Sequence, residues 1–129
     1  MGVSFSLEEN PLRKDLKSVH AFLEMVRSCL QDEDSWDWLT RRPENRSFVT
    51  GHGLSRGDIR RELETLSSKH RTQGPMDDDA MCREAGTVFV FSKPFETETG
   101  LINLYIKIKI PDDEPFCIVV SFHEEGRVG

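Results

Sequence analysis

The chain is poor in cysteine and contains no long apolar run. Its three cysteines, Cys29, Cys82 and Cys117, are an odd number with no C-x-x-C pair, which argues against a disulfide framework or a zinc knuckle. No apolar run approaches the ~18 residues that a membrane span needs, and the N-terminal residues lack the basic and apolar regions of a signal peptide. These absences predict a cytoplasmic protein with no membrane segment and no structural metal.

The chain also lacks the basic excess that is typical of nucleic-acid-binding proteins. Its net charge is −6, and all of it comes from residues 74–129, which hold eleven acids and five bases, whereas residues 1–73 hold twelve of each. Because neutralising phosphates supplies much of the affinity for a polyanion, any such site must be a local patch. The sequence has no P-loop, no G-x-G-x-x-G motif and no internal repeat, and we expect no cofactor.

Two helices are predicted in the first half of the chain. Asn10-Pro11 has the cap and first-turn residues of a helix start. A helical apolar stripe follows it for about twenty residues, formed by Leu12, Leu16, Val19, Leu23, Val26 and Leu30. Further on, Ser55 and Asp58 resemble a capping box, and Leu54 and Ile59 a hydrophobic staple, so a second helix begins there. This helix carries dense positive charge at Arg56, Arg60 and Arg61.

The segments around the second helix are predicted to be irregular. Trp36–Arg46 is expected to be a long connection that its tryptophans anchor to the core, and Gly51–Gly53 a flexible joint. The arginines of the connection fit either a phosphate site or a solvated charged loop. Thr72–Pro75 is predicted to end the second helix.

Three strands are predicted in the second half. Gly86–Ser92 is apolar on both faces, so we expect it inside a sheet. Lys93–Gly100, rich in Pro, Thr and Glu, is predicted to be a loop. Leu101–Ile110 and Phe116–His123 then alternate on either side of the turn-like Pro111–Glu114, which predicts an antiparallel hairpin.

Alternation sorts the hairpin side chains onto two faces. In the first strand one parity is entirely aliphatic, at Ile102, Leu104, Ile106, Ile108 and Ile110. The second strand divides into two groups, with Phe116, Ile118, Val120 and Phe122 on one side and Cys117, Val119, Ser121 and His123 on the other. If like faces lie together, one face gathers Tyr105, Lys107, Lys109, Ser121 and His123. Matching the polar faces puts Tyr105 opposite Ser121 or Val119, with His123 one pair away.

The predicted order is helix, connection, helix and three strands. This order indicates an α+β fold in a single domain spanning residues 1–129, with helices packed on a small antiparallel sheet. The N-terminal helical part covers about residues 1–50.

Several stretches, taken in order, resemble the MqsR-type toxins of bacterial toxin–antitoxin systems. They are Gly53-Leu-Ser-x-x-Asp58, the Gly74-Pro-x-Asp77 turn, the Val/Phe strand, Leu104-Tyr-Ile-Lys-Ile108 and Val119-Val-Ser-Phe-His123-Glu124. The resemblance covers roughly residues 50–126 and is most specific in the last two strands. It implies a RelE-like fold, with the toxin core at about residues 51–126.

The resemblance also implies an activity and a set of site residues. These toxins are small, metal-independent endoribonucleases that cut mRNA and are held in check by a cognate antitoxin protein. The family's active-site tyrosine falls on Tyr105, a basic helix residue on Arg61 (an arginine here instead of a lysine) and a glutamine on Gln73. His123 stands where the family can have a lysine, so no catalytic role is carried over to it.

Chemistry adds roles to these residues. RNA cleavage without a metal needs a base for the 2′-hydroxyl proton, an acid for the 5′-oxygen and cations around the phosphorane. Histidine is the natural proton carrier near neutral pH, which favours His123. Tyr105 can transfer a proton only if positive charge lies nearby, and Lys107 is close enough in the sequence to supply it. Arg61 suits phosphate binding. The expected catalytic set is therefore Tyr105, His123, Arg61 and Lys107, and the expected RNA contacts are Arg60, Gln73 and Lys109.

A second hypothesis remains open at this stage. The net charge of −6 and the arginine at position 61 also fit a non-catalytic regulatory module that binds protein or RNA on the same fold. In that case Tyr105 and His123 are ordinary polar residues on the solvent side of a sheet.

Overall fold

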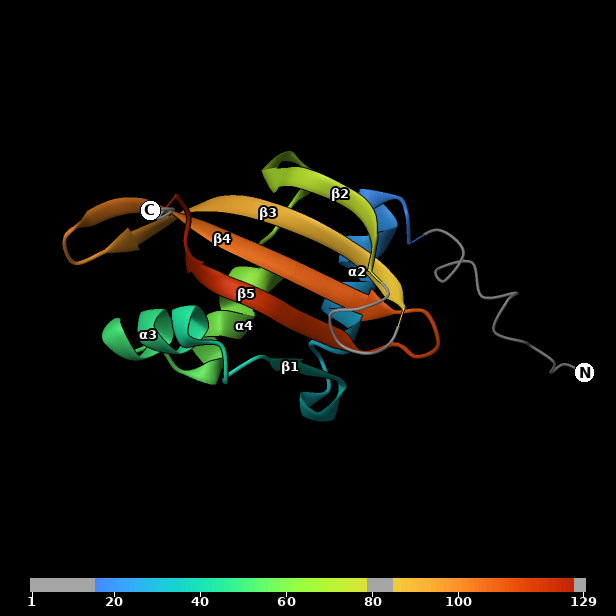
Figure 1. Cartoon of the computed structure of the whole chain (residues 1–129), viewed down its shortest axis with the longest axis horizontal. Helices are drawn as coiled ribbons and strands as arrows, with labels where there is room; N and C mark the ends of the chain where they lie inside the picture. The colour runs from blue at the N-terminus through green and yellow to red at the C-terminus, as the bar shows by residue number, and fades with distance from the viewer. Residues whose placement is uncertain (1–15, 79–84, 127–129) are drawn as a thin grey trace, which may run out of the picture.

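The chain folds into a curved five-stranded sheet with helices on one face and beside one edge (Figure 1). The computed structural model describes residues 16–78 and 85–126. Its α-helices are α2 (Val19–Cys29), α3 (Pro43–Gly51) and α4 (Arg56–Glu64), with short 3-10 helices η2 (Glu33–Ser35) and η3 (Ser68–His70). The strands are β1 (Trp36–Trp38), β2 (Arg71–Asp78), β3 (Gly86–Thr97), β4 (Gly100–Pro111) and β5 (Cys117–Glu124).

The sheet is mixed, which corrects the expectation of a purely antiparallel one. Its strand order is β1-β5-β4-β3-β2. Strands β2 to β5 pair antiparallel, whereas β1 pairs parallel with β5 through Trp36↔Cys117 to Trp38↔Val119. The α+β class is confirmed. Strand β1 escaped prediction because three residues are too few for alternation to be recognised.

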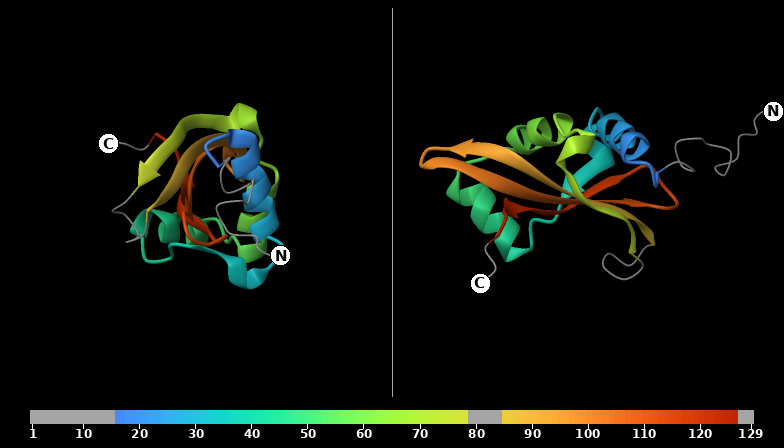
Figure 2. Two further views of the ribbon diagram at one scale, coloured as in Figure 1. Left: turned by 90° about the vertical axis from the view of Figure 1, so that its right-hand side faces the viewer. Right: turned by 90° about the horizontal axis from the view of Figure 1, so that it is seen from above.

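Helices α2 and α4 cover one face of the sheet and enclose the core (Figure 2). The apolar stripe predicted for the first helix is buried from Leu16 onwards. The predicted start at Asn10-Pro11 lies outside the described residues. Leu16–Ser18 form a turn, and the helix begins at Val19 with the Ser18 hydroxyl as its cap. The core on this face comprises Phe22, Val26, Ile59, Leu63, Phe89, Phe91, Leu104, Ile106 and Ile108.

Helix α4 begins as the sequence predicts. The Ser55 side chain accepts from the Asp58 N–H at 3.1 Å, and the Asp58 carboxylate accepts from the Ser55 N–H at 2.8 Å, so the capping box is confirmed. Hydrogen bonds that the Asp58 carboxylate accepts from the Ser55 backbone and then from the Ser55 hydroxyl hold the pKa of Asp58 below its usual value. Ile59 is fully buried and Leu54 packs against the same core, as a hydrophobic staple requires.

The segment Thr72–Pro75, predicted to be irregular, is part of a strand. Residues around Gly74-Pro75 belong to β2, whose pairing with β3 is irregular on both sides of Gln73. Gly74 has φ +110°, and a Cβ there would lie 2.8 Å from the Val88 carbonyl oxygen. Glycine and proline depress strand propensity, but an edge strand tolerates both, which explains why the sequence pattern failed here.

Strands β3 and β4 form a hairpin where a loop was predicted. Strand β3 continues through the expected loop at Lys93–Gly100 as far as Thr97, and β4 starts at Gly100 after a turn at residues 98–99. Its tip projects beyond the helices (Figures 1 and 2), and Leu101 near the tip is 71% exposed. The prediction that Gly86–Ser92 lies inside the sheet is confirmed, since β3 has β2 and β4 as neighbours.

A β-bulge in β5 changes the predicted sorting of its side chains. Lys107 pairs with Ser121, but the next residue, Ile108, pairs with Val119, so Val120 is the extra residue. The bulge moves Val119 and Cys117 to the core face and Ile118 to the other face. The predicted grouping of these three residues was therefore wrong, because strict alternation does not survive a bulge.

Helix α3 was not predicted, and one side chain fastens it to the bulge. Asn45 is fully buried, and its Nδ2 donates to the carbonyl oxygens of Val120 and Leu39, both at 3.0 Å. Its Oδ1 accepts from the N–H of Phe122 at 2.9 Å. Because β1 pairs with β5 only as far as Val119, Asn45 satisfies the strand edge where β1 ends.

We expect Asn45→Ala to lower the free energy of unfolding by about 2–3 kcal/mol, because it leaves buried backbone groups of β5 unsatisfied. Urea unfolding followed by circular dichroism measures this loss. The matched control is Thr50→Ala, an exposed change in the same helix that should alter stability by less than about 0.5 kcal/mol. Equal effects of the two changes would refute the structural role of Asn45.

Two buried thiols lie where α2 meets the start of β5. Cys29 and Cys117 are both free, and the Cys29 thiol donates to the Pro115 carbonyl oxygen at 3.3 Å. Burial raises the pKa of Cys29 to about 11. Burial, and to a smaller extent the nearby Cys29 thiol, raise the pKa of Cys117 above that of Cys29. Because the thiolate is the reactive form, both groups are inert in the folded protein.

In a Cys82→Ser variant, we predict that Ellman's reagent titrates neither remaining thiol of the folded protein at mildly alkaline pH. Both should react at once after unfolding in guanidinium chloride, since the pKa then returns to its ordinary value. Rapid reaction of one thiol without denaturant would show that α2 and β5 do not enclose it.

Among the residues that the structure describes, no helix has the length and apolar character to cross a membrane.

Candidate functional site

The register of the sheet gathers the predicted polar side chains on the face away from α2 and α4. Residues that pair directly across strands point to the same side of a sheet. One row across β3, β4 and β5 is Ser92, Tyr105 and His123, and the next, which includes β2, is Gln73, Val90, Lys107 and Ser121. A third row contains Met76, Val88, Lys109 and Ile118. The expectation that Tyr105, Lys107, Lys109, Ser121 and His123 share this polar face is confirmed.

Tyr105 and His123 are direct neighbours, closer than expected. They pair with each other across β4 and β5, and their rings stack with centroids 5.2 Å apart and planes inclined by 26°. The predicted registers, with Tyr105 opposite Ser121 or Val119, were wrong by at least one pair. The connection at residues 112–116 and the bulge at Val120 shift the register, and neither shift is visible in the alternation pattern.

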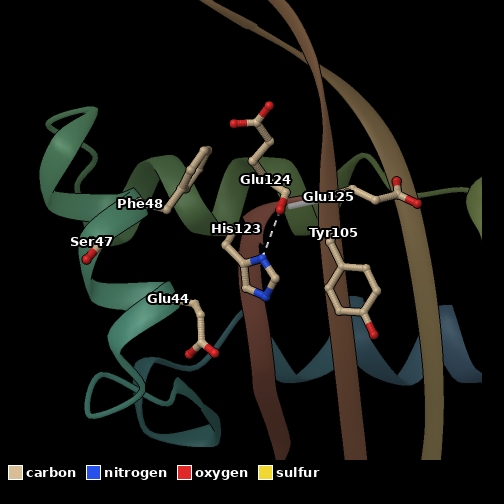
Figure 3. A pocket seen from close by; sticks show the side chains of 8 residues that line it. Glu44, Ser47, Phe48, Tyr105, His123, Glu124 and Glu125 are labelled. Atoms are coloured by element: carbon tan, nitrogen blue, oxygen red, sulfur yellow. Dashed lines mark hydrogen bonds between the residues drawn. The ribbon is translucent and has the colours of Figure 1, made fainter. Parts of the chain in front are cut away.

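The imidazole of His123 is held in a defined orientation. Its Nδ1 lies 3.0 Å from the carbonyl oxygen of Glu124, drawn as the dashed line in Figure 3. A carbonyl oxygen can only accept, so Nδ1 carries the proton of this hydrogen bond. In the neutral ring the lone pair then resides on Nε2, which points away from Glu124 (Figure 3). His123 therefore presents a proton acceptor beside the Tyr105 ring.

Helix α3 supplies the other side of a groove around this pair. The groove has a volume of about 530 Å³, and its lining comprises Glu44, Ser47, Phe48, Tyr105, His123, Glu124, Glu125 and Gly126. Figure 3 shows Glu44 and Phe48 of α3 extending toward the strands that carry Tyr105 and His123. Phe48 also packs on Phe122 with ring centroids 6.0 Å apart, which fixes the helix against the sheet. None of these α3 residues was predicted, because Glu44 lies in the expected connection Trp36–Arg46 and no element was predicted for Ser47 and Phe48.

The groove is acidic beside the Tyr105–His123 pair. Glu125 accepts a 2.5 Å hydrogen bond from the Ser92 hydroxyl. In the described part of the chain, the carboxylates of Glu44 and Glu124 form no hydrogen bond and no ion pair. Negative charge thus lies where the prediction placed cations.

The remaining predicted residues on the polar face occupy different environments. Lys107 is half-buried one row from Tyr105, at about 7 Å along the strand from the spacing of a β-strand. Gln73 lies in the same row as Lys107 but on the edge strand β2, where it is exposed. Lys109 is fully buried, so its ammonium does not lie on the surface that RNA would contact.

Helix α4 does not form the opposite wall of this site. Its Ile59 and Leu63 pack in the core on the other face of the sheet, and Figure 3 shows α4 behind the strands that carry Tyr105 and His123. Lys93, which also points to that side, donates to the Glu62 carbonyl oxygen of α4 at 3.1 Å. The sheet therefore separates Arg60 and Arg61 from Tyr105.

The α4 arginines are also paired with carboxylates. Arg61 binds Asp58 at 3.2 Å and Arg60 binds Glu64 at 2.9 Å. Arg56 binds Glu33 and Asp37, donates to the Trp36 carbonyl oxygen at 2.7 Å and lies 3.8 Å from the Trp36 ring centre. This arginine fastens β1 and η2 to the start of α4, which is a structural role.

Within residues 16–78 and 85–126, no group of three His, Cys, Asp or Glu side chains is placed to hold a metal ion. Comparison of the chain with protein-family profiles, with curated proteins and with solved structures finds no match.

We predict that His123 is the tautomer protonated on Nδ1 at alkaline pH, where imidazole is neutral. Long-range ¹H–¹⁵N correlation spectra distinguish the two ring nitrogens by their chemical shifts. Exposed His20, which has no such carbonyl partner among the described residues, serves as the internal control and should show both tautomers. Protonation of His123 on Nε2 would contradict the orientation derived from the Glu124 hydrogen bond.

Proposed function

We propose that this protein is a metal-independent endoribonuclease acting as the toxin of a toxin–antitoxin pair on a RelE-like fold. The observation that carries the proposal is the stacked Tyr105–His123 pair at the wall of a groove. The α+β architecture and the order of the motifs in β4 and β5 support it. Its substrate is mRNA in the cytoplasm, and its partner is a cognate antitoxin protein.

The proposed reaction needs two proton transfers. His123 Nε2 removes the proton from the 2′-hydroxyl, whose oxygen attacks the adjacent phosphorus. The bond from phosphorus to the 5′-oxygen breaks, and that oxygen takes a proton from the Tyr105 hydroxyl. The products are a 2′,3′-cyclic phosphate and a free 5′-hydroxyl, and solvent returns the two groups to their starting protonation states.

Electrostatic stabilisation of the phosphorane falls to Lys107. It is one row from the pair on the same face, and in the proposal it replaces Arg61, which the sheet separates from the groove. Arg60 and Lys109 likewise have no direct part in this version of the site. With one lysine near the phosphate and carboxylates beside it, the protein should bind RNA weakly and cleave it slowly.

A non-catalytic binding module is the second candidate, and one observation favours it. The carboxylates of Glu44 and Glu124, which have no partner among the described residues, line the groove beside His123, and negative charge repels a phosphate backbone. Such a groove accepts an amine or guanidinium from a protein as readily as a neutral part of RNA.

Cleavage of a fluorescently labelled single-stranded RNA in EDTA tests the first candidate. We expect Tyr105→Phe and His123→Ala each to lower the cleavage rate by about 100- to 10,000-fold, because each removes a proton-transfer group. Mass spectrometry should find the cyclic phosphate end.

The matched control is Arg61→Ala, which removes an exposed cation on the far side of the sheet and should leave the rate within about threefold. Full activity of both the Tyr105 and the His123 variants would refute the site. A wild-type protein that binds RNA or a basic peptide without cutting RNA would support the binding module.

A further inference from the structure

The groove beside the proposed catalytic pair has the chemistry of a base-binding site and not of a phosphate-binding site. Its walls include the rings of Phe48, Tyr105 and His123, and aromatic rings are the usual stacking surfaces for unpaired bases. Its polar groups include the carboxylates of Glu44, Glu124 and Glu125. A carboxylate repels phosphate oxygens but accepts hydrogen bonds from the amino and imino groups of bases.

Among these acids, Glu44 is placed to read a base. It comes from α3, across the groove from the Tyr105–His123 pair, and in Figure 3 its side chain extends on the side to which His123 Nε2 points. Neither oxygen is occupied by another described residue, so both can accept. Glu125, in contrast, already accepts from Ser92, and the Glu124 side chain points away from His123 in Figure 3.

We propose that this groove is a base-recognition subsite that takes a nucleobase bearing an exocyclic amino group next to the scissile phosphate. Adenine, cytosine and guanine carry such a group, whereas uracil presents carbonyl oxygens on both sides of its single imino group. The Glu44 carboxylate attracts the amino group and repels those oxygens, so Glu44 is a residue that determines specificity. This inference rests on the proposed function, and it names the class of substrate that the same site selects.

The size of the groove agrees with this occupant. A cavity of about 530 Å³ lies within the range of pockets that enclose small ligands. A base stacked on the pair would bring its own ribose close to His123, so recognition and cleavage would involve neighbouring atoms. The neighbouring hollow beside His52, of about 320 Å³, lies at the β3–β4 hairpin and shares no lining residue with this groove.

Oligonucleotides with a single ribonucleotide in a deoxythymidine background test the preference. In one series the ribonucleotide carries each of the four bases, and in the other the base on its 3′ side varies. In at least one of the two series, we expect the wild-type kcat/KM to be about 10- to 100-fold lower for uracil or thymine than for the best amino-bearing base. Glu44→Gln should reduce that difference to within about threefold, because an amide donates to carbonyl oxygens as well.

The control variant is Glu96→Gln, which removes the same charge from the neighbouring hollow and should keep the wild-type preference. Equal cleavage rates for the four bases in both series would overturn the inference while leaving the nuclease proposal intact. So would an unchanged base preference in Glu44→Gln.

A binding measurement separates failure of the two proposals. If the wild type cuts none of these substrates, the nuclease proposal fails, and the base preference is then read from the Kd of uncleavable 2′-O-methyl hexamers of adenosine, cytidine and uridine. The inference expects the uridine hexamer to bind the wild type about tenfold more weakly than the better of the other two. It fails if the three bind equally or if none binds.

Discussion

The bridge that Asn45 makes between α3 and β5 is the interaction on which the candidate site depends. One buried amide satisfies the Val120 carbonyl and the Phe122 N–H at the position where β1 no longer covers the edge of β5. These hydrogen bonds hold the bulge, which reverses the predicted alternation before Val120, and they hold α3 beside the strand that carries His123. Together with the packing of Phe48 on Phe122, these hydrogen bonds fix Glu44 and Phe48 opposite the Tyr105–His123 pair.

The sheet divides the molecule into two chemically different sides. On one side, α4 carries Arg56, Arg60 and Arg61, which are committed to Asp58, Glu64, Glu33 and Asp37. On the other side lies a groove with aromatic walls and carboxylates. The proposed nuclease would gain its affinity by enclosing a base, since the groove offers little positive charge to attract the phosphate backbone. The net charge of −6 agrees with a site that does not depend on attraction to the phosphate backbone.

The sequence predicts the periodic parts of this fold well and the parts set by long-range contacts poorly. The capping box at Ser55, the buried strand β3 and the shared face of Tyr105 and His123 follow from local patterns. The parallel strand β1 and the bulge at Val120 do not, because each depends on a partner far away in the chain. Helix α3 had a local signal in Pro43, which is favoured at a helix start, but the charged residues around it concealed the apolar face of Phe48.

The most direct test of the account is an NMR titration of the ¹³C,¹⁵N-labelled protein with a 2′-O-methyl RNA that cannot be cleaved. The chain contains a single tyrosine, so its ring signals report on Tyr105 without ambiguity. We predict that the ring signals of Tyr105 and His123 and the amide of Glu44 shift together on binding, while the guanidinium signals of Arg60 and Arg61 remain in place. Shifts at those arginines with no change at Tyr105 would contradict the assignment of the groove as the site.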